Sequence, residues 1–288
     1  MIGPISKTNS LGDSSKKETS SFISNEKLIS IITQLEADIA DGSWPRKNYS
    51  TMDLKIMPAL VMQANSKFPE MNLNFVKSPK DLCIELKNAI EHGVESSRFI
   101  INMGEDGIHF SALDYKRING KTSLILFEPA NFRGLGPGLL GVRTKMAIEQ
   151  YQLPDCHFSM VEMDIQRSSS GCGIFSLALA KKLYIERDSL LKIHEENIQG
   201  TLSDGEMPLH HDKTDPYLPV TFYKHTQGKR RLNEYLNANP QGVNTVINKK
   251  NETILTRLAN NQSVINGKEL SVSVHKKRIA EYNALLKS

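Results

Sequence analysis

The sequence predicts a mixed α/β fold of the α+β kind, in which a mostly antiparallel sheet is flanked by helices. Residues 107–127 alternate between apolar and polar around Asn119-Gly120, a dipeptide typical of two-residue β-hairpin turns. A strand pattern at 156–164 is followed by an apolar helical pattern at 174–182. Helical patterns also occupy both ends of the chain, so we expect the α/β core to cover 71–220.

Composition narrows the class of protein. The 288 residues can bury one good core and an accessory element, and 39% hydrophobic with 24% charged residues is ordinary for a soluble protein. A net charge of +4 does not by itself imply nucleic acid, and we expect neither membrane insertion nor a signal peptide, since no suitable apolar run is visible. The three cysteines, Cys83, Cys156 and Cys172, indicate a reducing compartment without a disulfide framework.

The N-terminal elements are expected to be helical after a disordered start. Residues 5–24 are rich in Ser, Lys, Thr and Asn, which predicts that the segment 1–24 is disordered. An amphipathic helix follows at 25–41, and a second covers 52–66 with Pro58 as a kink or break. Residues 25–70 should join the C-terminal helices of 221–288 in a second, regulatory lobe.

The first half of the core alternates strands and helices. A short strand is predicted at 71–76, a helix opened by Ser78-Pro79 and ended at Gly93, and a strand at 97–103. Cys83 lies on the apolar stripe of that helix, which favours a packing role.

The connections in the second half are predicted as follows. The glycine-rich segment 131–141 lacks the ending of a phosphate loop, which favours a flexible connector before a helix at 139–151. Asp188 should cap a further helix. Residues 200–220 read as a solvated loop, and its adjacent His210-His211 lack further ligands for a metal site.

Cys172 falls at or just inside the predicted N-terminus of the helix that follows the central strand. Free backbone N–H groups and the helix dipole favour a thiolate there, although a buried structural cysteine fits the local pattern as well. Gln166, six residues upstream, can donate its side-chain amide toward an oxyanion beside the sulfur. Gln-x5-Cys-Gly before an apolar helix is typical of cysteine enzymes of the adenain/ubiquitin-like-protease type, in which a His and an acidic residue come earlier.

His109 and Glu128 supply that His and that acidic residue. Pairing across the hairpin places Glu128 opposite, or one step off, residue 111, within diagonal reach of His109. A strand histidine alone is more often a packing residue. Because His109, Glu128, Gln166 and Cys172 occur in a consistent order, we predict that they form one catalytic site.

Basic residues gather in two stretches. The denser is 223–231, with a helix continuing to about 239, and the second, 275–278, opens the last helix. Each can be a solvated helix face. Together with Lys181-Lys182 they indicate anionic ligands, with phosphates the favoured kind.

Short segments over essentially the whole chain match one known family in register. They are Asp41-Gly42-Ser43-Trp44, Ile101-Asn102-Met103-Gly104, Gly107-Ile108-His109, Leu126-Phe127-Glu128-Pro129-Ala130, Leu153-Pro154-Asp155-Cys156, Asp164-Ile165-Gln166-Arg167-Ser168-Ser169-Ser170, Tyr223-Lys224-His225-Thr226-Gln227 and Asn248-Lys249-Lys250-Asn251-Glu252-Thr253. On these segments the chain resembles the YopJ family of bacterial type III secreted effectors. The resemblance implies a protease-like catalytic core that acetylates Ser and Thr, with Lys as a further acceptor, on host MAP kinase kinases and IKK-type kinases. It also implies acetyl-CoA as donor, inositol hexakisphosphate as activator, and secretion into the host cytoplasm.

The resemblance also implies roles for individual residues. The triad carries over as His109, Glu128 and Cys172. The family usually has Glu directly before the Cys, whereas Gly171 stands here, which removes a negative charge and adds backbone freedom. Residues expected to bind the two ligands are His109, Arg167, Ser168, Lys182, Lys224, His225, Thr226 and Gln227 for the donor, and Arg257, His275, Lys276, Lys277 and Arg278 for the activator, with Lys229, Arg230 and Arg231 as further candidates.

Two other classes of function remain open on the sequence. A cysteine protease acting on ubiquitin-like conjugates would use the same triad but would need a narrow channel for a Gly-Gly tail. A catalytically idle kinase-binding module would bind targets without modifying them.

Overall fold

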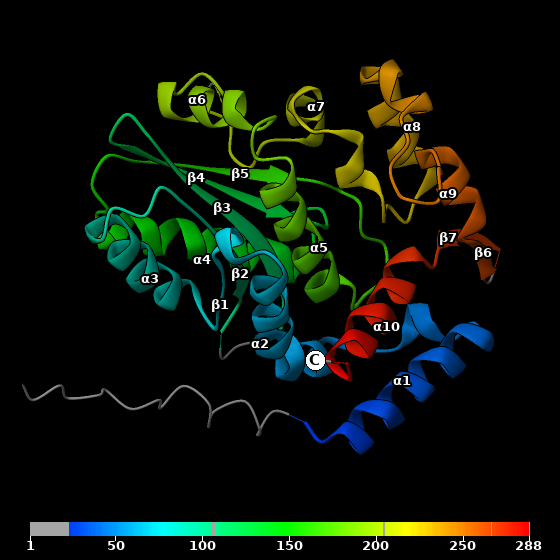
Figure 1. Ribbon diagram of the computed structural model, residues 1–288. Helices are drawn as coiled ribbons and strands as arrows, with labels where there is room; N and C mark the ends of the chain where they lie inside the picture. Colours follow the sequence, from blue (N-terminus) through cyan, green and yellow to red (C-terminus); the bar gives the residue numbers. More distant parts are fainter. Residues whose placement is uncertain (1–22, 105–106, 204, 266, 288) are drawn as a thin grey trace, which may run out of the picture.

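The computed structural model describes residues 23–104, 107–203, 205–265 and 267–287 (Figure 1). Apart from its last two residues, the segment predicted to be disordered lies outside the described residues. The described chain forms a mixed α/β fold around a five-stranded sheet in the order β1-β2-β3-β4-β5, which confirms the predicted class. No helix in the described ranges is long and apolar enough to cross a membrane.

The central sheet is equally parallel and antiparallel. Its strands are β1 (Leu73–Val76), β2 (Ser96–Asn102), β3 (Phe110–Ile118), β4 (Lys121–Glu128) and β5 (Cys156–Glu162). β1 runs parallel to β2 and β4 parallel to β5, while β2, β3 and β4 pair antiparallel. The expectation of a mostly antiparallel sheet was therefore wrong, because the helices after β1 and β4 carry the chain across and allow the next strand to run parallel.

Helices cover both faces of the sheet. They are α1 (Asn25–Ala40), α2 (Ser50–Lys67), α3 (Pro79–Glu91), α4 (Leu135–Tyr151), α5 (Cys172–Ile185), α6 (Leu191–Gln199), α7 (His211–Thr214), α8 (Lys229–Ala238), α9 (Ile254–Asn260) and α10 (Ser273–Leu285). Apolar residues of α3 and α4 pack with Phe99 and Leu113 on one face. Those of α2 and α5 pack with Ile100 and Ala112, which point to the other face. Glu128, at the end of β4, and His109, directly before β3, are therefore carried by a sheet that is covered on both faces.

The two ends of the described chain meet. α1 packs against α10, and α10 in turn packs against α2 and α5; Figure 1 shows α1 in blue beside α10 in red. This contact agrees with the expected association of N- and C-terminal helices, while their division from the core as a regulatory lobe stays a prediction. The hairpin of β6 (Gln262–Ile265) and β7 (Lys268–Ser271), which precedes α10, was not predicted.

Two predicted helices need correction. α2 runs unbroken through Pro58, because the loss of one backbone hydrogen bond is outweighed by the burial of neighbours such as Met57 and Leu60. Leu190 rather than Asp188 is the N-cap of α6, although the Asp188 carbonyl accepts a hydrogen bond from Leu191.

The predicted loops are more ordered than expected. α4 begins at Leu135, so most of the glycine-rich segment is helix rather than a flexible connector. The stretch 200–220 includes α7 and buries His211, so it is not a solvated loop throughout. The helix expected from 223 begins only at Lys229, because the residues before it are folded into the core.

Candidate functional site

The hairpin brings His109 to Glu128 as its register predicts. Ala112 pairs with Phe127, so Glu128, the last residue of β4, falls beside Ser111, and His109 lies diagonal to it. The distance from His109 Nε2 to Glu128 Oε2 is 2.9 Å. Ser111 Oγ donates to the same carboxylate oxygen, and the Ala130 backbone N–H donates to Oε1 at 2.9 Å. The buried carboxylate therefore has a fixed orientation toward the imidazole.

Cys172 is the first residue of α5, as predicted, and only 2% of it is exposed. Its sulfur lies close enough to the His109 imidazole to affect the pKa of the ring. Because Nε2 faces Glu128, Nδ1 is the ring nitrogen left for the sulfur. Gly136 closes the other side of the ring: a Cβ there would stand 3.3 Å from His109 Cβ, so a side chain would crowd the imidazole.

The electrostatics of this group favour a charged imidazole. Burial opposes the imidazolium, yet the Glu128 carboxylate and the hydrogen bond with Cys172 raise the pKa of His109 to about 10. At neutral pH the imidazole is therefore protonated. An imidazolium beside a sulfur stabilises the thiolate, which is the nucleophilic form.

Gln166 lies on the buried turn that precedes Cys172. Its Nε2 donates to the Ser168 carbonyl at 2.7 Å, which leaves one amide hydrogen of that nitrogen for another acceptor. The backbone N–H groups of the first turn of α5 start at Cys172. The first N–H groups of α5 and the remaining amide hydrogen of Gln166 are donors of the kind that a developing oxyanion requires.

Gln227, 60 residues after Arg167, holds the same turn. Its Oε1 accepts from the backbone N–H groups of Arg167 at 2.6 Å and Ser168 at 2.8 Å. Its Nε2 donates to Ser168 Oγ at 3.1 Å. Three of the residues predicted to bind the donor, Arg167, Ser168 and Gln227, are thus hydrogen-bonded together and shape the turn.

The side chain of Arg167 points from this turn toward the carboxylate of Asp164. Its Nη1 and Nη2 donate to Asp164 Oδ1 and Oδ2 at 2.7 and 2.8 Å. Gly171, the departure from the family pattern, also belongs to this turn: a Cβ there would lie 2.8 Å from Ser168 Oγ. A larger residue at 171 would therefore require Ser168 to move.

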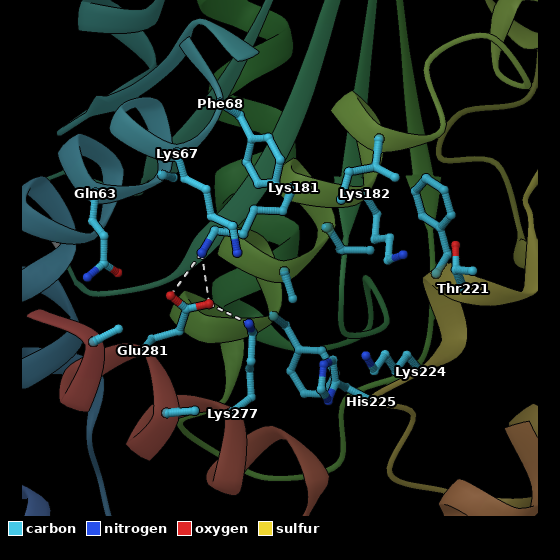
Figure 2. Close-up of a pocket in the computed structure, with 18 of the residues that line it drawn as sticks. Gln63, Lys67, Phe68, Lys181, Lys182, Thr221, Lys224, His225, Lys277 and Glu281 are labelled. Carbon is cyan, nitrogen blue, oxygen red and sulfur yellow. Dashed lines mark hydrogen bonds and ion pairs between the residues drawn. The ribbon is translucent and has the colours of Figure 1, made fainter. Parts of the chain in front are cut away.

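A pocket of about 520 Å³ opens beside α5 and is surrounded by lysines (Figure 2). They come from α2, α5, the segment before α8, and α10, and are Lys67, Lys181, Lys182, Lys224 and Lys277. Glu281 is the acidic member of the described lining and pairs with Lys181 at 2.8 Å and Lys277 at 2.5 Å. Phe68, Phe175 and Phe222 contribute apolar lining. We call this the lysine pocket.

The five lysines of this pocket have fewer carboxylates in the described lining than would neutralise them. Burial lowers the pKa of Lys181 and Lys182 in spite of the carboxylates of Glu281 and Glu186. Burial and the nearby charges of Arg257, Lys182 and Lys277 lower the pKa of Lys224 to about 8. Cations held together in this way are stabilised by an anionic ligand.

The structure places some of the predicted ligand residues in the lysine pocket and others inside the protein. Lys182, Lys224, His225 and Lys277 line the lysine pocket, although the sequence assigned them to two different ligands. Lys67 and Glu281 were missing from the predicted site, and Lys181 was named only with Lys182 as a basic pair, because only the folded chain brings α2, α5 and α10 together.

Several predicted ligand residues face inward instead. His275 is buried between Trp44 and Tyr49, and Arg278 is paired with Asp53 at 2.9 Å, so 275–278 does not act as one basic cluster. The others form internal contacts: Arg231 with Asp215, Arg257 with Glu252 and Ser273, Lys276 with Asn261, and Thr226 buried in the segment 223–227. Across the described ranges, no group of three or more His, Cys, Asp or Glu side chains is placed to hold a metal ion.

Comparison with known proteins gives consistent matches. The family model of YopJ serine/threonine acetyltransferases matches residues 28–284. The serine/threonine-protein acetyltransferase YopJ of Yersinia pestis is 78% identical over 287 residues, with 100% of both chains covered, and that of Yersinia pseudotuberculosis is 77% identical over the same length.

Two solved structures are also similar to this chain. AvrA with IP6 (inositol hexakisphosphate) and CoA is 56% identical, with 92% of this chain and 100% of that chain covered and a TM-score of 0.89. HopZ1a in complex with IP6 shares the fold, with a TM-score of 0.73 over 90% of this chain and 92% of that chain, at 19% identity.

Proposed function

The chain belongs to the YopJ family of serine/threonine acetyltransferases, and from this premise we propose that it transfers acetyl groups from acetyl-CoA to hydroxyls of host kinases through Cys172. The observation that carries the proposal is the buried contact of His109 with both Glu128 and Cys172. MAP kinase kinases and IKK-type kinases are the proposed targets, in the host cytoplasm after secretion.

The first half of the proposed reaction loads Cys172. His109 holds the proton of the sulfur, and Glu128 fixes the imidazole and stabilises its charge. The thiolate attacks the thioester carbonyl of acetyl-CoA, while Gln166 and the first N–H groups of α5 stabilise the oxyanion. The thiol of CoA leaves with a proton, and the acetyl group remains on sulfur.

The second half transfers the acetyl group. A Ser or Thr hydroxyl of the target attacks the acetyl carbonyl, with neutral His109 as the base that takes its proton. The sulfur leaves as thiolate and regains the imidazolium as its partner. The triad is compatible with hydrolysis too, so the bound target hydroxyl must exclude water from Cys172.

We further propose that the lysine pocket binds inositol hexakisphosphate. Its lysines converge from four segments on one space, which suits a compact ligand charged on all sides better than an extended one. The lowered pKa of Lys224 and its neighbours supports the same assignment, since phosphates would relieve their mutual repulsion. Binding there would join α10 to α5 and so favour one arrangement of the helices around Cys172.

Incubation with radiolabelled acetyl-CoA and a MAP kinase kinase, with and without inositol hexakisphosphate, tests the proposed function. Label on Ser or Thr of the kinase, increased by the polyphosphate, is expected. Cleavage of a ubiquitin-like tail without label on the kinase would favour the cysteine protease instead. Binding without either reaction would favour the idle kinase-binding module.

Removing two pocket lysines should weaken polyphosphate binding. In Lys224→Ala/Lys277→Ala, two cations that line the pocket are lost, and calorimetry should show an affinity for inositol hexakisphosphate about 100-fold lower, at roughly tenfold for each charge-assisted contact. Lys276→Ala is the matched control: Lys276 is exposed, adjacent in sequence, and bonded to Asn261. Equal affinities of the double variant and the control would exclude the pocket as the site.

Arg167 is proposed to contact the donor, since it leaves the turn beside Cys172. Arg167→Ala should raise the KM for acetyl-CoA about tenfold, as expected for one charge-assisted contact, with little change in the alkylation of Cys172 by iodoacetamide. Arg230→Ala is the control, because Arg230 also approaches Asp164, at 3.5 Å, but is largely exposed. An unchanged KM would remove Arg167 from the donor site.

A further inference from the structure

We infer that Arg278 of α10 is a positioning residue for Cys172, which holds the turn before the sulfur. This inference rests on the proposed role of Cys172 as nucleophile. It assigns a function to a residue that the sequence placed in a phosphate-binding cluster.

Arg278 is fully buried and reaches the catalytic turn directly. Its Nη2 donates to the Ser170 carbonyl at 2.6 Å, two residues before Cys172. The same guanidinium is paired with Asp53 of α2, through Nε to Oδ1 and Nη2 to Oδ2, both at 2.9 Å. Tyr282 Oη donates to Asp53 Oδ1 at 2.6 Å, so the position of the pair is fixed.

The pair also touches the chain just after Cys172. A Cβ on Gly173 would lie 2.8 Å from Asp53 Oδ2, so α5 can begin here only with a glycine against the carboxylate. Cys172 is therefore bracketed: Arg278 holds Ser170 on one side, and Asp53 packs on Gly173 on the other. A shift of α10 relative to α2 would displace the contacts of Arg278 with Ser170 and of Asp53 with Gly173, and would therefore move the sulfur of Cys172.

The guanidinium interacts electrostatically with the sulfur. Burial disfavours its charge, but Asp53, Tyr282 and Cys172 together raise the pKa of Arg278. The charged groups that face Cys172 are thus His109, backed by Glu128 from the hairpin, and Arg278, backed by Asp53 from the helices.

The chain contains a matched network that contacts the segment leading into this turn at Met163, and not at Ser170 or Gly173. Arg231 is also fully buried, donates to Asp215 Oδ1 and Oδ2 at 2.6 and 2.9 Å, and donates to the Met163 carbonyl at 2.9 Å. Tyr223 donates to Asp215 at 2.6 Å, as Tyr282 does to Asp53. The charges that act on Arg231 are those of Asp215 and Tyr223. Loss of this network should cost similar stability without the same effect on Cys172.

The test compares Asp53→Asn/Arg278→Gln with Asp215→Asn/Arg231→Gln in the full chain. Each removes both charges of a pair, so neither leaves a lone buried charge. The pH dependence of Cys172 alkylation by iodoacetamide is followed by peptide mass spectrometry, without acetyl-CoA. In the Arg278 double variant the Ser170 carbonyl loses its donor and the sulfur is no longer held against His109, so the midpoint should move up by about one pH unit, with alkylation at neutral pH about tenfold slower. The control should keep the wild-type midpoint.

A pair of single variants covers the case in which a double variant does not fold. Arg278→Lys keeps the charge but loses the forked contact with Asp53 and Ser170, so it should slow alkylation severalfold, whereas Arg231→Lys should not. Equal midpoints and equal rates for the Arg278 and Arg231 variants would overturn the inference. The two proposals can fail separately. If the Arg278 variants shift the midpoint but the wild-type protein transfers no acetyl label, the proposed function is contradicted and the role of Arg278 stands.

Discussion

Replacement of Cys172 by alanine is expected to abolish the transfer of labelled acetyl groups to a kinase, with a loss of about 10⁶-fold as for other covalent nucleophiles. The physical reason is that Cys172 is the cysteine that interacts with His109, and both halves of the proposed reaction pass through its sulfur. Label on the kinase is counted over time, and circular dichroism verifies that the variant is folded.

The other two cysteines provide the controls. Burial raises the pKa of Cys83 to about 11, and burial with the nearby Cys83 raises that of Cys156 to about 12, so both remain thiols at neutral pH. Cys156→Ser should keep most of the activity. Cys83→Ser, inside the core, should keep the chemistry but cost about 1–3 kcal/mol of stability through its buried hydroxyl. Full activity of Cys172→Ala would exclude Cys172 as the nucleophile of a His109-Glu128-Cys172 triad.

The parts of the site that were predictable are those fixed by local chain geometry. Asn119-Gly120 sets the turn and register of the hairpin, and the register alone brings His109 to Glu128. The change from strand to helical periodicity likewise places Cys172 at the start of α5. Each of these steps depends on neighbours in sequence, so no knowledge of the rest of the fold was needed.

The parts that were not predictable depend on contacts between distant segments. In the sequence Lys277 and Arg278 look alike, but the turn of α10 directs one into the lysine pocket and the other to Asp53, 225 residues away. Gln227 looked like a ligand residue and instead supports the turn at Arg167 and Ser168. A basic cluster in a sequence reveals the number of cations, while only the folded chain reveals which of them are already neutralised.

Glu128→Gln should lower the rate of acetyl transfer by about 10²–10⁴-fold. The carboxylate is a main cause that raises the pKa of His109 to about 10 against burial. With a neutral amide in its place, burial dominates and the pKa of His109 falls, so the imidazolium that accompanies the Cys172 thiolate is lost at neutral pH. Initial rates of labelling at saturating acetyl-CoA measure the effect. Ser111→Ala is the matched control: it removes one hydrogen bond to Glu128 but keeps the charge, and should cost less than about tenfold.

The same substitution has a pH signature in stability. A histidine whose pKa is about 10 in the folded protein and 6.5 in the unfolded chain stabilises the fold fully below pH 6.5, and this contribution is lost as the pH rises through 10. The thermal unfolding midpoint of the wild type should therefore exceed that of Glu128→Gln most at pH 6.5, and the difference should shrink toward pH 10. A difference that stays constant over this range would mean that Glu128 supports the fold by its hydrogen bonds to Ser111 and Ala130 alone, and not through the charge of His109.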